Sequence, residues 1–146
     1  LGGLPKNFYC LMGDGEMNEG NVWEAMLNLS KYNLTNIITI IDRNGIQIDG
    51  RTEDVLPLES LSEKLKAFNF NVLEIDGHNM MEIVNAINIA KSNSIQPTMI
   101  IAHTIPGRGY KDIEGDYHWH GKAPNKEEAR AALREIRTMG GKINFE

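Results

Sequence analysis

Short apolar runs alternate with stretches of helical periodicity along this chain, and this alternation constrains the fold more than any other feature. Strand-like runs cover residues 7–12, 36–42, 71–76 and 98–104. The second of them contains IITII, which is uniformly apolar, as expected for a strand covered on both faces. Apolar residues recur at helical spacing within 21–29, 58–68, 79–90 and 125–136. The alternation predicts a three-layer α/β/α domain with a mainly parallel sheet.

Polar residues at the start of each helical stretch resemble capping boxes, in which Asn or Ser is followed three residues later by Glu. The pairs are Asn21–Glu24, Ser60–Glu63, Asn79–Glu82 and Asn125–Glu128. Each pair predicts the first turn of a helix.

Composition excludes several classes of function. The chain has 146 residues and a net charge of −5 without a basic tract, which argues against nucleic acid as a partner. No apolar stretch approaches the roughly 18 residues that span a membrane. Cys10 is the single cysteine, and its place in a strand predicts a buried, unreactive thiol.

We expect a soluble, cytoplasmic protein of one domain over residues 1–146, N-terminally incomplete because Leu1 leads almost directly into a strand.

Glycine, aspartate and asparagine are concentrated just after the predicted strands, where parallel sheets bind ligands. The segments are GDGEMNEG, RNGIQIDG, DGHN and HTIPGRGY. A dinucleotide site is one reading of the first, but Asn18 stands where its third glycine belongs and Asp14 would repel a pyrophosphate. Asn44–Gly45 by itself also fits a type I′ hairpin turn, although IITII is too apolar for a half-exposed hairpin arm.

A divalent cation explains the acid between two glycines. Asp14 and Asn44 follow two strands, and neighbouring parallel strands would place both side chains on one rim. Carboxylate and amide oxygens suit Mg²⁺ or Ca²⁺, and a backbone carbonyl after Asn44 can supply a third ligand. The cation would then bridge Asp14 to a diphosphate, with Gly13 and Gly15 allowing close approach of the backbone.

The string GDGEMNEG, with Asn44 following Asp14 by 30 positions in DRNGIQIDG, resembles the thiamine diphosphate signature. EGNVWEA, NGIQIDG, HTIPGRGY and WHGKAPN further resemble transketolases, above all the N-terminal subunit of split transketolases, in which two chains replace one. The resemblance covers roughly residues 5–138. It implies a diphosphate-binding domain that lacks the first part of that domain.

The resemblance also implies roles for individual residues. Asp14, Asn44 and the carbonyl of Ile46 match metal ligands, and Gly15, next to Gly13 and Asp14, matches the amide that meets the diphosphate. Further matches are Glu19 at the dimer interface, Ile48 against the cofactor, Asp42 in support of the ligands, and His120 near diphosphate and substrate as the catalytic candidate. Arg43 stands where many family members carry Asp or Asn.

The implied activity is the transfer of a two-carbon ketol unit between ketose and aldose sugar phosphates. It needs thiamine diphosphate, Mg²⁺ or Ca²⁺, and a C-terminal subunit with the pyrimidine-binding domain, assembled as a dimer of such pairs. The chain alone is expected to be inactive. The alternatives are a 1-deoxyxylulose-5-phosphate synthase-like enzyme, against which WHGKAPN argues, and a non-catalytic cofactor-binding subunit.

Other residues have simpler readings. Glu19 also fits a solvated residue at a helix start, and the pair His118 and His120 suggests zinc only weakly without a nearby third ligand. We expect His78 and His103 to be hydrogen-bonded structural residues. Trp23 and Trp119 are expected in the core or at an interface.

Overall fold

A parallel four-stranded sheet forms the centre of the computed structural model, which describes residues 6–140. Its strands are β1 (Phe8–Gly13), β2 (Ile37–Arg43), β5 (Asn71–Asp76) and β6 (Thr98–His103). They lie in the order β1-β2-β6-β5, and all neighbouring pairs are parallel. The register places Gly13 opposite Asp42, and Arg43 opposite His103. All four predicted strands are confirmed, with ends shifted by about a residue.

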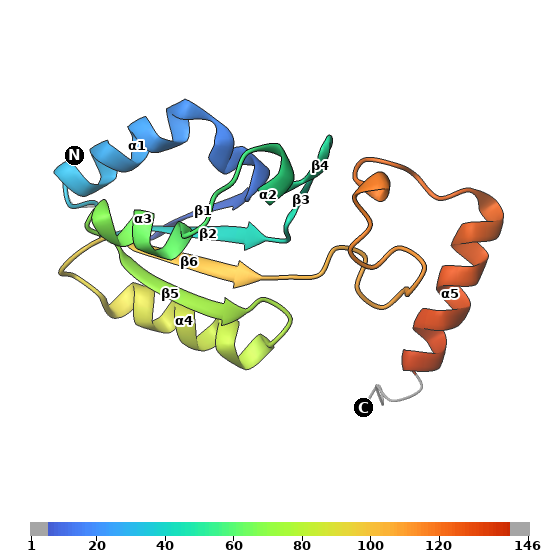
Figure 1. The fold of residues 1–146 in the computed structure, drawn as a ribbon. Helices are drawn as coiled ribbons and strands as arrows, with labels where there is room; N and C mark the ends of the chain where they lie inside the picture. The colour runs from blue at the N-terminus through green and yellow to red at the C-terminus, as the bar shows by residue number, and fades with distance from the viewer. Residues whose placement is uncertain (1–5, 141–146) are drawn as a thin grey trace.

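Helices cover both faces of this sheet (Figure 1). Helices α1 (Gly20–Lys31) and α3 (Leu61–Ala67) lie on one face, and α4 (Met80–Ser92) lies on the other. Successive residues of β6 point to opposite faces, so Met99 and Ile101 pack with α1 and α3, whereas Ile100 packs with α4. The three-layer α/β/α prediction is confirmed.

The connections at the carboxyl ends of the strands build further small elements. Asp14 is followed by the 3₁₀ turn η1 (Gly15–Asn18), and β2 by an antiparallel pair, β3 (Ile46–Gln47) and β4 (Gly50–Arg51). The short helix α2 (Thr52–Val55) comes next. Asn44–Gly45 is therefore not a hairpin turn between β2 and β3, because β2 pairs in parallel with β1 and β6.

The segment after β6 extends beyond the sheet. It contains the 3₁₀ turn η2 (Tyr117–Trp119) and ends in α5 (Lys126–Gly140), which Figure 1 shows past the strand ends and on neither face of the sheet. Within residues 6–140, no helix has the length and apolar composition that a membrane crossing needs.

Two of the four predicted N-caps are seen, Asn79 and Asn125, and the reciprocal bond of a capping box forms at Asn125 but not at Asn79, whose own amide donates to the Asp76 carbonyl. Asn79 accepts hydrogen bonds from the amides of Met81 and Glu82. Asn125 accepts from the amides of Glu127 and Glu128, and Glu128 Oε2 accepts from the Asn125 amide in return, at 2.7 Å.

The other two boxes are wrong. Helix α1 begins at Gly20 because the turn η1 leads straight into Glu19, which has the extended backbone of an N-cap residue. Asn21 therefore lies inside the helix. Ser60 is the N-cap of α3, but its side chain makes no capping bond within the described chain.

The prediction of a buried Cys10 is wrong, since its thiol is exposed. Strand β1 is at the edge of the sheet that the structure describes, and its Leu11 is 71% exposed. An apolar run identifies a strand, but it does not tell where in the sheet the strand lies.

Candidate functional site

Asp14 and Asn44 lie together at the carboxyl edge of the sheet, as their places after neighbouring parallel strands predict. The Asp14 amide extends the β1–β2 ladder by donating to the Asp42 carbonyl at 3.1 Å. The Gly45 amide donates to Asp14 Oδ2 at 2.8 Å, which joins the two loops directly. The backbone ladder thus sets the distance between the two candidate ligands.

Both residues line a cavity of about 420 Å³, here called the strand-end cavity. It gathers the sequence-predicted residues Gly13, Asp14, Gly15, Glu19, Asn44, Ile46, Ile48 and His120, and adds Glu16, Gln47 and Asp49. Of the predicted site residues, Asp42 is absent from this wall.

The Asp14 carboxylate is fully buried and only half satisfied. Its Oδ2 accepts from the Gly45 amide and from Arg43 Nη1, the latter at 2.5 Å. Its Oδ1 is buried without a hydrogen-bond partner among residues 6–140. A buried carboxylate oxygen without a donor is unfavourable, so this atom fits a cation ligand.

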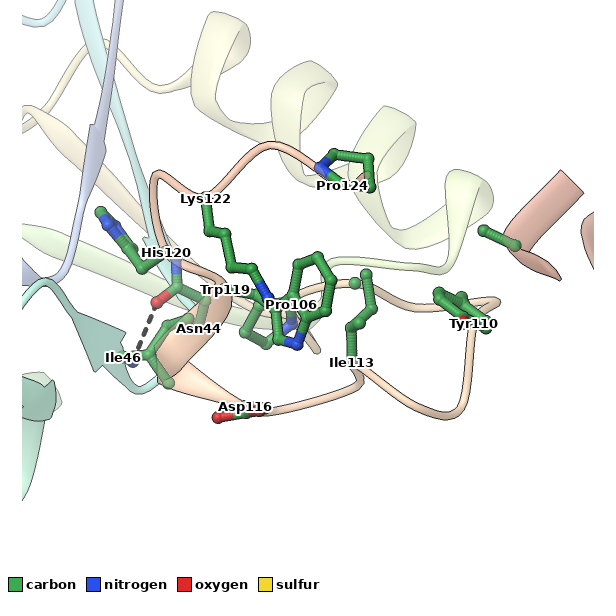
Figure 2. A pocket seen from close by; sticks show the side chains of 12 residues that line it. Asn44, Ile46, Pro106, Tyr110, Ile113, Asp116, Trp119, His120, Lys122 and Pro124 are labelled. Atoms are coloured by element: carbon green, nitrogen blue, oxygen red, sulfur yellow. Dashed lines mark hydrogen bonds between the residues drawn. The ribbon is translucent and has the colours of Figure 1, made fainter. Parts of the chain in front are cut away.

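Asp42 fixes the orientation of the Asn44 amide. Asn44 Nδ2 donates to Asp42 Oδ2 at 3.2 Å, and the other oxygen of Asp42 accepts from the Thr104 hydroxyl. Asn44 Oδ1 accepts from the Ile46 amide at 3.0 Å, the dashed bond in Figure 2. An amide oxygen has two lone pairs, so Asn44 Oδ1 can also face a cation.

Gln47 is a cavity residue that the sequence did not reveal. Its Nε2 is buried and has no partner in the described part of the chain. It also packs on Gly15, because a Cβ added there would lie 3.0 Å from Gln47 Cβ and 3.0 Å from its Oε1. Two lining residues, Asp14 and Gln47, therefore carry an acceptor and a donor that have no partner among residues 6–140. A ligand that satisfies both carries a cation and acceptor oxygens.

Glu19 and Ile48 lie at the open side of the cavity. Glu19 is exposed at the N-cap of α1, where its side chain makes no capping bond within residues 6–140. Ile48, between β3 and β4, is 75% exposed. Because Ile48 lines the cavity and is exposed, its apolar side chain is accessible to a molecule that enters there.

His120 belongs to two cavities. It lines the strand-end cavity and also a neighbouring cavity of about 250 Å³, shared with Asn44, Ile46 and Trp119 (Figure 2). Lys122 Nζ lies 3.8 Å from the centroid of the Trp119 ring. We call this second cavity the Trp119 pocket.

The remaining histidines have local partners. His118 Nδ1 lies 2.7 Å from Asp116 Oδ1, and this hydrogen bond lowers the pKa of Asp116. His118 lines neither cavity, so the two histidines of the HxH pair do not converge. His78 accepts from the Ile105 amide and His103 pairs with Glu74, which confirms both as hydrogen-bonded structural residues.

The two tryptophans have different surroundings. Trp23 packs against the core and donates to the Met17 carbonyl at 2.8 Å, which confirms its prediction. Trp119 instead lines the Trp119 pocket together with His120.

Arg43 is the other residue whose role the sequence did not reveal. Its side chain is 8% exposed, and its guanidinium reaches Asp14 and Glu53 at 2.5 Å each and Glu59 at 2.9 Å. Burial opposes its charge, but the hydrogen bonds to Asp14, Glu59 and Glu53 prevail and raise the pKa of Arg43. A charged residue that ends an apolar strand signals a buried ion pair, yet nothing in residues 52–60 identified its partners.

Comparison with known proteins gives a consistent result. A family model described as "Transketolase, thiamine diphosphate binding domain" matches residues 4–146. An apulose-4-phosphate transketolase subunit of Phocaeicola vulgatus is 40% identical over 128 residues, which cover 88% of this chain and 46% of the relative. The "6-deoxy-6-sulfo-D-fructose transketolase subunit SqwG" of Clostridium sp. is 40% identical over 137 residues, covering 94% of this chain and 50% of the relative.

Solved structures agree with the sequence relatives. The transketolase of Campylobacter jejuni superimposes with a TM-score of 0.72 at 27% identity, over 94% of this chain and 25% of that chain. The chain thus spans about half the length of the curated subunits that it matches.

Proposed function

Because this chain belongs to the transketolase family, as its thiamine diphosphate binding domain, we propose that it binds thiamine diphosphate through a divalent cation in the strand-end cavity. We further propose that, with a chain carrying the pyrimidine-binding domain, it transfers a two-carbon ketol unit between ketose and aldose sugar phosphates. The observation that carries the proposal is the pair of unpartnered buried atoms, Asp14 Oδ1 and Gln47 Nε2, on one cavity wall of the described chain.

The donor set fits a hard cation together with a diphosphate. Asp14 Oδ1, Asn44 Oδ1 and the Ile46 carbonyl would hold Mg²⁺ or Ca²⁺, since all three are oxygen ligands. Gly15, at the first position of η1, would offer its amide to the diphosphate, and Gln47 Nε2 would donate beside it. Asp42 keeps the Asn44 amide turned so that its oxygen, and not its nitrogen, is available to the cation.

The chemistry of the reaction divides between cofactor and protein. Thiamine diphosphate, when bound, supplies the electron sink that stabilises the carbanion left by C–C cleavage. His120, between the strand-end cavity and the Trp119 pocket, is placed to orient the sugar and to move protons at its hydroxyl and carbonyl oxygens. Ile48 offers an apolar surface to the cofactor.

A partner chain completes the proposal. Two relatives are named as subunits of apulose-4-phosphate transketolases, and each is about twice the length of the segment matched here. Exposed Glu19 beside the cavity is our candidate for the contact between the two chains, in a dimer of such pairs. The activating acid of the cofactor would come from that partner.

The decisive assay measures ketol transfer by the assembled pair. The relatives named above carry different sugars in their names at equal identity, so the assay needs a panel of ketose donors. We expect transfer from at least one ketose when both chains, thiamine diphosphate and Mg²⁺ are present, and none when Asp14→Asn replaces the parent. Cofactor binding without any transfer across the panel would instead support a non-catalytic role for the chain.

A further inference from the structure

Arg43 connects Asp14, the candidate metal ligand, to helix α2 and to the segment that leads into α3. It lies at the end of β2, and its planar guanidinium makes two kinds of contact: Nη1 bonds to Asp14, and Nη2 bonds to both Glu53 and Glu59. We propose that Arg43 is a positioning residue that holds the Asp14 carboxylate in a fixed orientation and thereby makes the site favour Mg²⁺ over Ca²⁺. This inference rests on the proposed function.

The geometry on the Asp14 side separates the two carboxylate oxygens. Arg43 Nη1 and the Gly45 amide both bond to Oδ2, at 2.5 and 2.8 Å. These two donors leave Oδ1 as the oxygen without a partner among the described residues. Rotation of the carboxylate would break the Arg43 and Gly45 bonds together. These two hydrogen bonds therefore fix the orientation of the Asp14 carboxylate.

The geometry on the opposite side anchors Arg43 itself. Glu53 Oε1 also accepts from the Leu58 amide at 3.1 Å, and Glu59 Oε2 accepts from the Leu61 amide at 3.2 Å, where α3 begins. Leu58 and Leu61 are both buried in the core. The buried chain at the start of α3 therefore positions Arg43, and Arg43 in turn orients Asp14.

Charge does not argue against this role. One guanidinium faces three carboxylates, those of Asp14, Glu53 and Glu59, so the cluster remains negative and still attracts a cation. A lysine at position 43 would keep the charge, but an ammonium lacks the fork that contacts carboxylates on two sides.

A fixed carboxylate matters more for one cation than for the other. Mg²⁺ requires near-ideal octahedral geometry at about 2.0–2.1 Å, whereas Ca²⁺ accepts longer and more variable contacts. Loosening Asp14 should therefore weaken Mg²⁺ binding more than Ca²⁺ binding. Loss of a group that orients a metal ligand typically lowers metal affinity about 10–100-fold.

The test compares Arg43→Lys and Arg43→Met with the parent, each assembled with its partner chain. Calorimetry at saturating thiamine diphosphate measures Kd for Mg²⁺ and for Ca²⁺ separately. The matched control is Lys66→Met, which breaks the exposed Lys66–Glu63 pair of α3 at 2.7 Å, far less buried than the Arg43 cluster. Thermal melting reports whether each variant is folded. If Arg43→Met does not fold, Arg43→Lys alone is compared with the parent.

We expect Arg43→Lys to weaken Mg²⁺ binding by about 10–100-fold and Ca²⁺ binding by a smaller factor, with both unchanged in Lys66→Met. A merely structural role would lower both affinities in the same proportion, by reducing the folded fraction. Equal losses, no loss, or tighter binding would each overturn the inference. If the parent itself binds neither cation, the proposed function fails with it.

Discussion

Two residues of the strand-end cavity wall, Asp14 and Gln47, each carry a buried polar atom of opposite hydrogen-bonding character. Asp14 Oδ1 can only accept and Gln47 Nε2 can only donate, and neither has a partner in residues 6–140. Leaving both atoms buried and unpaired costs about 1–3 kcal/mol each. A ligand that carries a cation and an anionic oxygen removes both penalties at once.

Gly15→Ala should weaken thiamine diphosphate binding by about tenfold or more. The new methyl group would lie 3.0 Å from the Gln47 side chain and would displace it, at a cost of about 1–3 kcal/mol. Calorimetry on the assembled pair at saturating Mg²⁺ measures the change. Gly20→Ala is the control, because a Cβ there meets no atom within 4 Å in the described structure. Equal affinities for both variants would contradict the close packing of Gln47 on Gly15.

His120→Ala should lower turnover by about 10²-fold, the usual range for a positioned acid or base, while cofactor affinity changes less. The reason is its place between the strand-end cavity and the Trp119 pocket. Steady-state kinetics of ketol transfer at saturating cofactor gives kcat and KM. His118→Ala, whose side chain is 69% exposed and bonds to Asp116, should behave like the parent. An unchanged kcat in His120→Ala would remove this histidine from the catalytic residues.

At the scale of elements, α4 shows how a helix is fixed on the sheet. Ala86 and Ala90 of α4 pack on Ile38 and Ile100, and Asn79 caps the first turn. Glu82 accepts from the Asp76 amide at 2.8 Å, which joins the start of the helix to the end of β5. The cap therefore secures both the helix and the strand that precedes it.

Asn79→Ala should lower the free energy of unfolding by about 0.5–2 kcal/mol, the usual value of an N-cap. Asn21→Ala is a control chosen by the structure, since Asn21 follows the same sequence pattern but lies inside α1. It should change stability by less than about 0.5 kcal/mol. Urea unfolding followed by circular dichroism compares the two variants. A larger effect for Asn21 than for Asn79 would reverse the assignment of the caps.

These elements show what the sequence could and could not predict. Apolar runs and helical periodicity located the four strands and the helical segments, and the two central strands β2 and β6 are largely buried, as their apolar runs predicted. Asn79 and Asn125 were correct caps, whereas Asn21 was not, because the unpredicted turn η1 moved the helix start to Gly20. Asp14 and Asn44 were placed on one rim by strand order alone. Arg43 and Gln47 could not be assigned, since their contacts depend on β3 and α2, which have no periodicity of their own.

At the scale of the whole molecule, the strand-end cavity brings together the loops that follow β1 and β2 and, through His120, the segment that leads to α5. Glu19 and Ile48 both line it and are exposed, so the cavity is open to solvent beside these two side chains. Such a cavity is suited to completion by a second chain.

Glu19→Gln should weaken assembly or cofactor activation while Mg²⁺ affinity stays the same. Its carboxylate is exposed and distinct from the buried oxygens that would hold the cation. Analytical ultracentrifugation of the paired chains and a cofactor titration measure these properties. Glu24→Gln, also exposed on α1, is the control. If assembly and activation are both unaltered, Glu19 is a solvated residue of the helix start.

Thiamine diphosphate binding through a divalent cation held by Asp14 and Asn44 is the proposal from which the other predictions follow. The most direct measurement is a calorimetric titration of thiamine diphosphate into the assembled pair, with Mg²⁺ and again with excess EDTA. We predict binding with Mg²⁺, no measurable binding in EDTA, and none for Asp14→Asn under either condition, while the exposed Cys10→Ala binds like the parent. Equal affinity with and without the cation, or undiminished affinity in Asp14→Asn, would contradict the proposal.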